Sequence, residues 1–140
     1  RLVGSEMCIR DRIMLRANGY PRIFLHGVCG VFALALHDRL GYPISALHWR
    51  NEDPGDLWAG LEHLFCVAPG RGYVDVRGAT GDFQVFCMDF SSPKDFRILE
   101  DLDAAQLRTD LVHEMGQDNL DTLYNEAIDE IEAHLENYKV

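Results

Sequence analysis

Residues 27–40 read GVCGVFALALHDRL, and this stretch decides the fold. Alanine and leucine favour a helix. Gly41 and Pro43 predict where that helix ends, because glycine readily closes a helix in the left-handed conformation and proline cannot continue one. From Val31 to Leu36 the helix is apolar on every side. Such a helix belongs inside a fold, packed between other elements, and not on its surface.

Cys29 stands at the N-terminus of this helix. The first backbone N–H groups of a helix have no partner within it, and together with the helix dipole they favour a negative charge. A thiol placed there is expected to be acidified toward the thiolate, its reactive form. Gly27 and Gly30 flank Cys29 and would let a substrate backbone come close. The alternative is a buried cysteine packed beside two turn glycines, and this stretch alone does not separate the two.

After the helix the pattern changes to short strands separated by turn residues. We expect strands at 44–49, 61–67, 73–77 and 96–99, with Gly78 ending the third. Residues 68–72 have the length and chemistry of a hairpin turn. We also expect a helix capped by Asp103 that runs to about Met115, and an amphipathic helix at 118–138, while 80–90 fits either a strand or a short helix. The sequence therefore predicts an α+β domain, with the buried helix packed on a small antiparallel sheet and further helices at the C-terminus.

His63 and Asp75 are expected to share one face of that sheet. If Val67 pairs with Tyr73 across the turn, His63 and Asp75 are diagonal neighbours within side-chain reach. A carboxylate in that position fixes the tautomer of an imidazole and stabilises its protonated form. Aspartate is disfavoured in strands, so one that stands there often has a function. The alternative is a surface-facing Asp75 that pairs with Arg77.

Three motifs, in this order along the chain, resemble those of a known family. Residues 27–37 resemble the G-x-C-x-x-F-A-x-A-L helix start of small papain-like cysteine peptidase domains, which are related to the NlpC and transglutaminase-like group. Residues 63–67, HLFCV, are similar to the H-x-F/W-x-V strand of that family. Residues 73–78, YVDVRG, are similar to its Y-x-D-x-x-G strand. The resemblance covers roughly residues 26–80 and implies a papain-like fold.

The resemblance also implies roles for three side chains. Cys29 would be the nucleophile, His63 the general base and acid, and Asp75 the residue that orients His63. The implied reaction is hydrolysis of an amide or isopeptide bond in a peptide, protein or other amide substrate, through an acyl-enzyme on Cys29. The family usually has a glutamine or similar oxyanion donor before the cysteine, and this sequence has no convincing equivalent. Two alternatives therefore stay open: a catalytically inactive papain-like binding or accessory module, and an acyltransferase that uses an amine in place of water.

A metal site is the rival use of the same residues. His26 and Cys29, like His63 and Cys66, have a spacing that zinc ligands use. On a strand, however, His63 and Cys66 point to opposite faces, so we expect no metal, and nothing in the sequence calls for another cofactor. The remaining histidines are expected at ordinary surface or boundary positions: His37, His48, His113 and His134. Trp58 is expected to pack in the core or at its rim, or to shape a substrate cleft.

The composition excludes some classes of function. The chain has 140 residues, of which 47% are apolar, and a net charge of -10. No apolar run is long enough to span a bilayer, and no lysine and arginine cluster suggests a nucleic-acid partner. Nothing suggests secretion, so the four cysteines, Cys8, Cys29, Cys66 and Cys87, are expected to be reduced thiols in a cytoplasmic protein. The oligomeric state is not indicated.

The first residues are expected to have a different origin from the rest of the chain. Leu2 to Asp11 read LVGSEMCIRD, which resembles one translated reading frame of a common transposase sequencing adapter. A segment of that origin contributes nothing to the fold. Residues 1–12 are therefore expected to be non-native, with no function for Cys8, and residues 13–140 to form a single papain-like domain.

Overall fold

The computed structural model describes residues 19–70 and 72–139. The helices are α2 (Ile23–His26), α3 (Cys29–Leu40), α4 (Phe83–Cys87), α5 (Ala104–Met115), α6 (Gln117–Ala133) and α7 (Leu135–Tyr138). The strands are β1 (Ile44–Trp49), β2 (Leu61–Ala68), β3 (Gly72–Asp75), β4 (Gly78–Thr80) and β5 (Phe96–Leu102), and a 3₁₀ turn, η1 (Pro93–Asp95), precedes β5. The expectations for residues 1–12, including the one for Cys8, lie outside the described residues.

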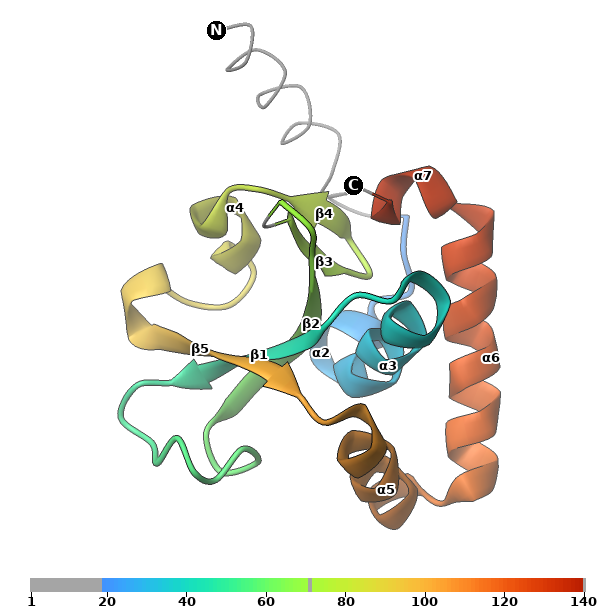
Figure 1. Ribbon diagram of the computed structural model, residues 1–140, viewed down its shortest axis with the longest axis horizontal. Helices are drawn as coiled ribbons and strands as arrows, with labels where there is room; N and C mark the ends of the chain where they lie inside the picture. Colours follow the sequence, from blue (N-terminus) through green and yellow to red (C-terminus); the bar gives the residue numbers. More distant parts are fainter. Residues whose placement is uncertain (1–18, 71, 140) are drawn as a thin grey trace, which may run out of the picture.

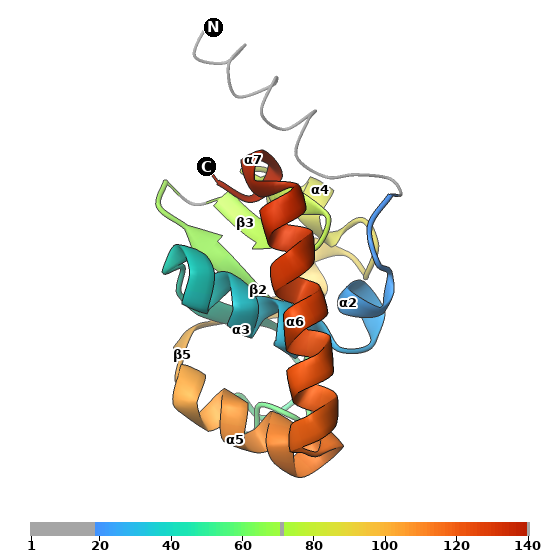
Figure 2. The ribbon, with the colours of Figure 1, turned by 90° about the vertical axis from the view of Figure 1, so that its right-hand side faces the viewer.

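The five strands form one antiparallel sheet in the order β4-β3-β2-β1-β5. Helix α3 packs on one face of this sheet, and the long helix α6 covers α3 from outside (Figures 1 and 2). The short helix α4 lies on the other side of the sheet (Figure 1). The α+β fold expected from the sequence, with a helix on an antiparallel sheet and helices at the C-terminus, is confirmed.

The central position of α3 explains why its sequence is apolar on every side. It contacts the sheet, α5 and α6, and residues 30–36 are all buried. The helix ends at Leu40 as expected, because Gly41 adopts the left-handed conformation with φ of 78° and its N–H bonds the carbonyl of His37 at 2.8 Å. The buried helix is therefore held by packing on several sides and by a glycine C-cap.

Apolar side chains that alternate between the two faces of the sheet form two separate apolar clusters. Ala46 and Leu64 belong to the main core beside α3, whereas Leu47 and Phe65 belong to a smaller core with Phe86 of α4. Successive strand side chains point to opposite faces, which is why neighbouring residues enter different cores. Each face of the sheet thus carries a covered apolar cluster, and a polar side chain that lies within either cluster is shielded from water.

Two predicted elements have different bounds. The third strand was expected to reach Arg77, but β3 ends at Asp75, and Gly78 begins β4. The turn between the two strands brings the Arg77 backbone N–H to within 2.9 Å of Asp75 Oδ1, so the side chain of Asp75 holds the turn that ends its own strand.

The expected helix over 118–138 is interrupted at His134, which has φ of -132°. The break lets α7 place Tyr138 in the core, where its hydroxyl donates to the carbonyl of Val76 at 2.8 Å. The ambiguous segment 80–90 contains helix α4, whose first N–H groups are capped by Asp82. Within the described part of the chain, no helix has the length and hydrophobicity needed to cross a membrane.

Candidate active site

Cys29 is the first residue of α3, at an edge of the sheet that no strand covers. Strand β3 pairs with β2 only from Cys66 to Ala68, so the earlier part of β2 is open on that side. The N-terminus of α3 lies there, and the Leu64 backbone N–H donates to Cys29 Sγ at 3.3 Å. Val28, the N-cap residue, gives the helix no side-chain cap. The thiol is therefore half-buried beside unpaired N–H groups of the first helical turn.

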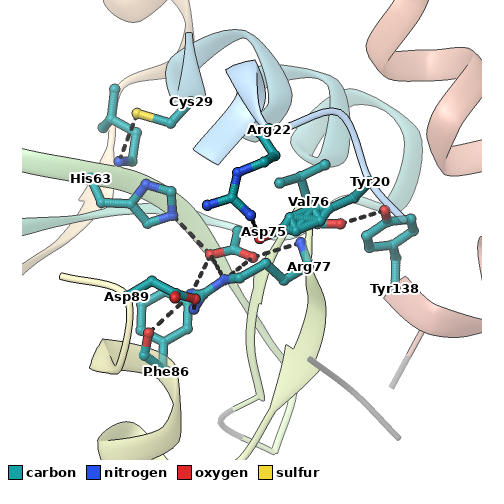
Figure 3. A network of polar contacts seen from close by, with 11 residues as sticks. Tyr20, Arg22, Cys29, His63, Asp75, Val76, Arg77, Phe86, Asp89 and Tyr138 are labelled. Carbon is teal, nitrogen blue, oxygen red and sulfur yellow. Dashed lines mark hydrogen bonds and ion pairs between the residues drawn. The ribbon is translucent and has the colours of Figure 1, made fainter. Parts of the chain in front are cut away.

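His63 and Asp75 meet on the face of the sheet that carries α4. Val67 pairs with Tyr73, as the hairpin turn predicted, and His63 Nε2 donates to Asp75 Oδ2 at 2.8 Å. Both side chains are buried. The bond holds the imidazole so that its other nitrogen, Nδ1, is on the side of Cys29 (Figure 3). Nδ1 has no hydrogen-bond partner of ordinary geometry among the described residues, so its contact with the thiol is looser than a hydrogen bond.

Arg77 clamps the carboxylate from the opposite side. Its Nη2 lies 2.7 Å from Asp75 Oδ2 and its Nε lies 3.1 Å from Oδ1, while Nη1 pairs with Asp89 at 2.9 Å (Figure 3). The guanidinium is buried and also donates to the carbonyl of Phe86. The surface-facing alternative for Asp75 is wrong, although its expected pairing with Arg77 is present. Asp75 is buried between two cationic partners, because the turn after β3 folds Arg77 back over it.

The charges of this buried group depend on one another. Burial by itself would raise the pKa of the Cys29 thiol, but the imidazole of His63 and the Leu64 N–H outweigh it, so that pKa is lowered. Burial would lower the pKa of His63, but Asp75 and Cys29 raise it to about 9. The pKa of Asp75 is far below its usual range, because His63 and Arg77 outweigh the effect of burial. Both the lowered pKa of Cys29 and the raised pKa of His63 act in the direction of a thiolate beside an imidazolium.

The other two described thiols have the opposite character. Burial raises the pKa of Cys66 well above its ordinary value, and Cys66 Sγ donates to the carbonyl of Ala33 in α3. Burial raises the pKa of Cys87 to about 11, which the charge of Arg77 partly offsets. Both thiols are therefore expected to react slowly near neutral pH. Cys87 is the last residue of helix α4. Cys29 is the only one of the three that has a lowered pKa.

The direction of the Cys66 side chain tests whether Cys66 and His63 could bind one zinc ion. Cys66 points toward α3, whereas the ring of His63 packs against Phe90 and Phe86 on the other face. Over residues 19–70 and 72–139, no three histidine, cysteine or acidic side chains are grouped so that they could hold a metal ion. The proposed zinc spacing therefore does not bring its two strand residues together.

A cleft of about 600 Å³ opens beside Cys29. Its walls come from the start of α3, from β2, from the loop that carries Trp58 and from α5. The lining residues are Gly27, Val28, Cys29, Gly30, Trp58, Leu61, Leu64, Asp110, Leu111, His113, Glu114 and Met115. Trp58 is half exposed, and its indole N–H donates to Asp110 Oδ2 at 3.0 Å. The contribution of α5 was missed from the sequence, where 104–115 reads as an ordinary amphipathic helix with no site signal.

His63 does not line this cleft. Its ring is wholly buried, and the ring of Phe90 lies over it with centroids 4.6 Å apart. A molecule in the cleft therefore meets the thiol of Cys29 first, and the imidazole lies behind it.

Comparison of the chain with protein-family models, with curated proteins and with solved structures finds no match. The evidence for the chemistry of this site is therefore the Cys29, His63 and Asp75 group and the cleft beside Cys29.

Proposed function

We propose that this protein is a papain-like thiol hydrolase that cleaves an amide or isopeptide bond through an acyl-enzyme on Cys29. One observation carries the proposal. A half-buried thiol with a lowered pKa lies at an uncapped helix N-terminus, beside an imidazole that a buried carboxylate holds in place. Structural cysteines have no need of this arrangement, whereas a thiol nucleophile does.

The first half of the reaction, formation of the acyl-enzyme, uses the negative charge of the Cys29 thiolate and the proton on His63. The Cys29 thiolate attacks the carbonyl carbon of the substrate, a C–S bond forms, and the carbonyl electron pair moves to oxygen. The first turn of α3 supplies N–H donors for that oxyanion from Cys29 and Gly30, since the Val31 N–H is already bonded to the carbonyl of Val28. These donors stand in for the missing upstream glutamine. The C–N bond then breaks, and protonated His63 gives its proton to the leaving amine.

The second half releases the acyl group. Neutral His63 takes a proton from water as the water oxygen attacks the thioester, and the C–S bond breaks to restore the thiolate and the imidazolium. Asp75 keeps Nε2 as the hydrogen-bond donor, so that Nδ1 handles the proton at the reacting side. Arg77 keeps Asp75 ionised and is a positioning residue, since it has no contact with the thiol.

The reactivity of the three described cysteines tests the proposal. Labelling with iodoacetamide near neutral pH, followed over time by mass-spectrometric mapping, should modify Cys29 fastest, because only its thiol has a lowered pKa. His63→Ala should slow that labelling by about tenfold or more, since the cation that stabilises the thiolate is lost. Asp75→Ala should slow it less, because Asp75 acts through His63.

Cys87→Ala serves as the control, because it removes a thiol without touching the ion pair. Its Cys29 should be labelled at the wild-type rate. Equal labelling of Cys29, Cys66 and Cys87, or a Cys29 rate indifferent to His63→Ala, would contradict the proposal.

A second candidate is a papain-like binding module without turnover, and the complete burial of His63 behind Phe90 favours it. Both candidates allow selective labelling of Cys29, so a peptide library with an amide reporter separates them: turnover that Cys29→Ala and His63→Ala each abolish supports the hydrolase. Selective labelling without any turnover supports the module. Product transferred to added hydroxylamine faster than to water identifies the third possibility, an acyltransferase.

A further inference from the structure

The cleft beside Cys29 combines an apolar floor with a rim of one charge sign. Its apolar lining comes from α3, β2, Trp58 and α5, its two carboxylates are Asp110 and Glu114, and His113 also lines it. Among its lining residues there is no lysine or arginine. The arginine of α5, Arg108, is committed elsewhere, since it pairs with Asp38 at 2.8 Å. Asp110 and Glu114, which we call the rim, therefore give this part of the lining a negative charge.

The positions of the two carboxylates, Asp110 and Glu114, are electrostatically unfavourable for helix α5. Asp110 and Glu114 are four residues apart on α5, and like charges at that spacing destabilise a helix. Glu114 also lies in the last turn, where the negative end of the helix dipole disfavours a carboxylate. Neither effect is offset by a lysine or arginine among the residues that line the cleft. Residues that violate local rules in this way are commonly found at functional sites.

Asp110 is also held in position. Its Oδ2 accepts from the indole N–H of Trp58 at 3.0 Å, and its Oδ1 accepts from Gln106 Nε2 at 2.9 Å. Each oxygen keeps a second lone-pair direction for another donor. The hydrogen bond from Trp58 to Asp110 also fixes the indole ring at the wall of the cleft. The face of an indole ring attracts cations. The rim is thus organised before a ligand binds.

We infer that the substrate is a cationic peptide, with an apolar side chain and a lysine or arginine side chain close to the bond that is cleaved. This inference rests on the proposed function, because it takes Cys29 as the reacting atom. The apolar side chain would lie on the floor made by Leu61, Leu64 and Leu111. The basic group would lie at the rim between Asp110 and Glu114.

Matched chloromethyl ketone probes test the charge preference without requiring turnover. Each probe is an acetylated dipeptide of leucine and one variable residue, which is lysine, norleucine or glutamate. Both sequence orders are made, with leucine first or second. Attack by the Cys29 thiolate forms a C–S bond and releases chloride. In at least one order the lysine probe should label Cys29 about tenfold faster than the glutamate probe, with norleucine between them. The preference should shrink at 0.5 M salt, where charges are screened over a few ångströms.

Two variants test whether Asp110 and Glu114 cause the preference for the lysine probe. Asp110→Asn combined with Glu114→Gln should abolish it, while labelling by small, neutral iodoacetamide stays at the wild-type rate. The amide that replaces the carboxylate at position 110 retains one oxygen, so it can still accept the bond from Trp58. Glu126→Gln, on the exposed face of α6, makes the same kind of charge change away from the cleft and should leave the preference intact.

The outcomes distinguish this inference from the proposed function. Selective labelling of Cys29 by iodoacetamide together with equal rates for the lysine and glutamate probes in both orders overturns the substrate class alone. Lack of selective iodoacetamide labelling overturns the proposed function, and the substrate class falls with it. A lysine preference that survives the double variant would likewise overturn the inference, because the rim would not be its source.

Discussion

At the scale of single residues, the buried charges around Asp75 decide how firmly His63 is held. Asp75 accepts from His63 on one side and from Arg77 on the other, and all three side chains are almost entirely buried. A buried ion pair need not stabilise a fold relative to apolar residues, but the loss of one partner leaves an uncompensated charge. Asp75 and Arg77 are therefore expected to depend strongly on each other.

A double-mutant cycle measures that dependence. Asp75→Asn and Arg77→Met should each lower the free energy of unfolding by about 3–5 kcal/mol, since each strands a buried partner. The double variant should lose clearly less than the sum, because it removes both charges. Urea unfolding followed by circular dichroism gives the three values. Asp38→Asn is the control: it breaks a partly exposed pair with Arg108 and should change stability by less than about 1 kcal/mol. Additive losses would show that Asp75 and Arg77 act independently.

At the scale of elements, the loop between β1 and β2 builds one wall of the cleft, and His48 anchors it. His48 was expected at a surface or boundary position, which is wrong, because its side chain is fully buried. Its Nε2 donates to the carbonyl of Asp56 at 2.9 Å, and its Nδ1 accepts from Arg97 at 3.3 Å. Gly60 lies against the imidazole, which leaves no room for a side chain there. Trp58 is therefore carried by a loop with a defined internal packing.

Gly60→Ala should disrupt that loop. A Cβ at this position would lie 2.5 Å from His48 Cε1 and 2.6 Å from Glu52 Cβ, and neither atom is the far end of a flexible chain. Overpacking of this kind is expected to cost about 1–3 kcal/mol of unfolding free energy, measured by urea denaturation. Gly55→Ala is the matched control in the same loop. Its Cβ would meet only the Asp53 carboxylate, at 3.3 Å, so its effect should stay within about 0.5 kcal/mol. Equal effects of the two substitutions would mean that His48 and Gly60 do not anchor the loop.

At the scale of the whole molecule, the opposite pKa shifts of Cys29 and His63 make stability depend on pH in an unusual way. The pKa of His63 is raised from 6.5 to about 9, so its stabilising contribution is complete below 6.5 and is lost as the pH rises through 9. The pKa of Cys29 is lowered from 9.0, so its contribution is complete above 9 and is lost as the pH falls. In the part of the range from 6.5 to 9 that lies above the lowered pKa of Cys29, the two contributions change in opposite directions and offset each other.

Cys29→Ser should remove that balance. With no thiolate, nothing from Cys29 offsets the contribution of His63, whose pKa is then raised by Asp75 alone and therefore by less than in the wild type. Relative to wild type, the variant should then lose unfolding free energy as the pH rises above 6.5, by up to about 1.4 kcal/mol per pH unit for one proton. Urea unfolding at about pH 6, 7, 8 and 9 gives the difference. Cys87→Ser, which removes a thiol with a raised pKa of about 11, should show no such trend. A constant difference between Cys29→Ser and wild type would mean that Cys29 is not ionised in this range.

The local parts of this protein followed from the sequence by itself. The apolar run at 31–36 and the glycine after Leu40 determined a buried helix with a fixed end, because helix propensity and capping act over a few residues. The turn at 68–72 determined the pairing of Val67 with Tyr73, and this register alone brings His63 to Asp75. Hairpin register is a local property, so the His63–Asp75 pair could be predicted without knowledge of the rest of the fold.

Only the tertiary structure decided what surrounds that pair. The approach of Cys29 to the open edge of β2 joins residues 35 positions apart, and the sequence suggested it through a family resemblance and not through spacing. The wall formed by α5, the cover of Phe90 over His63 and the burial of His48 had no local signal at all. Periodicity tells which face of an element is apolar, but not which other element covers it. That choice is made by packing between segments far apart in the chain, and it determines which polar groups are shielded and which meet the cleft.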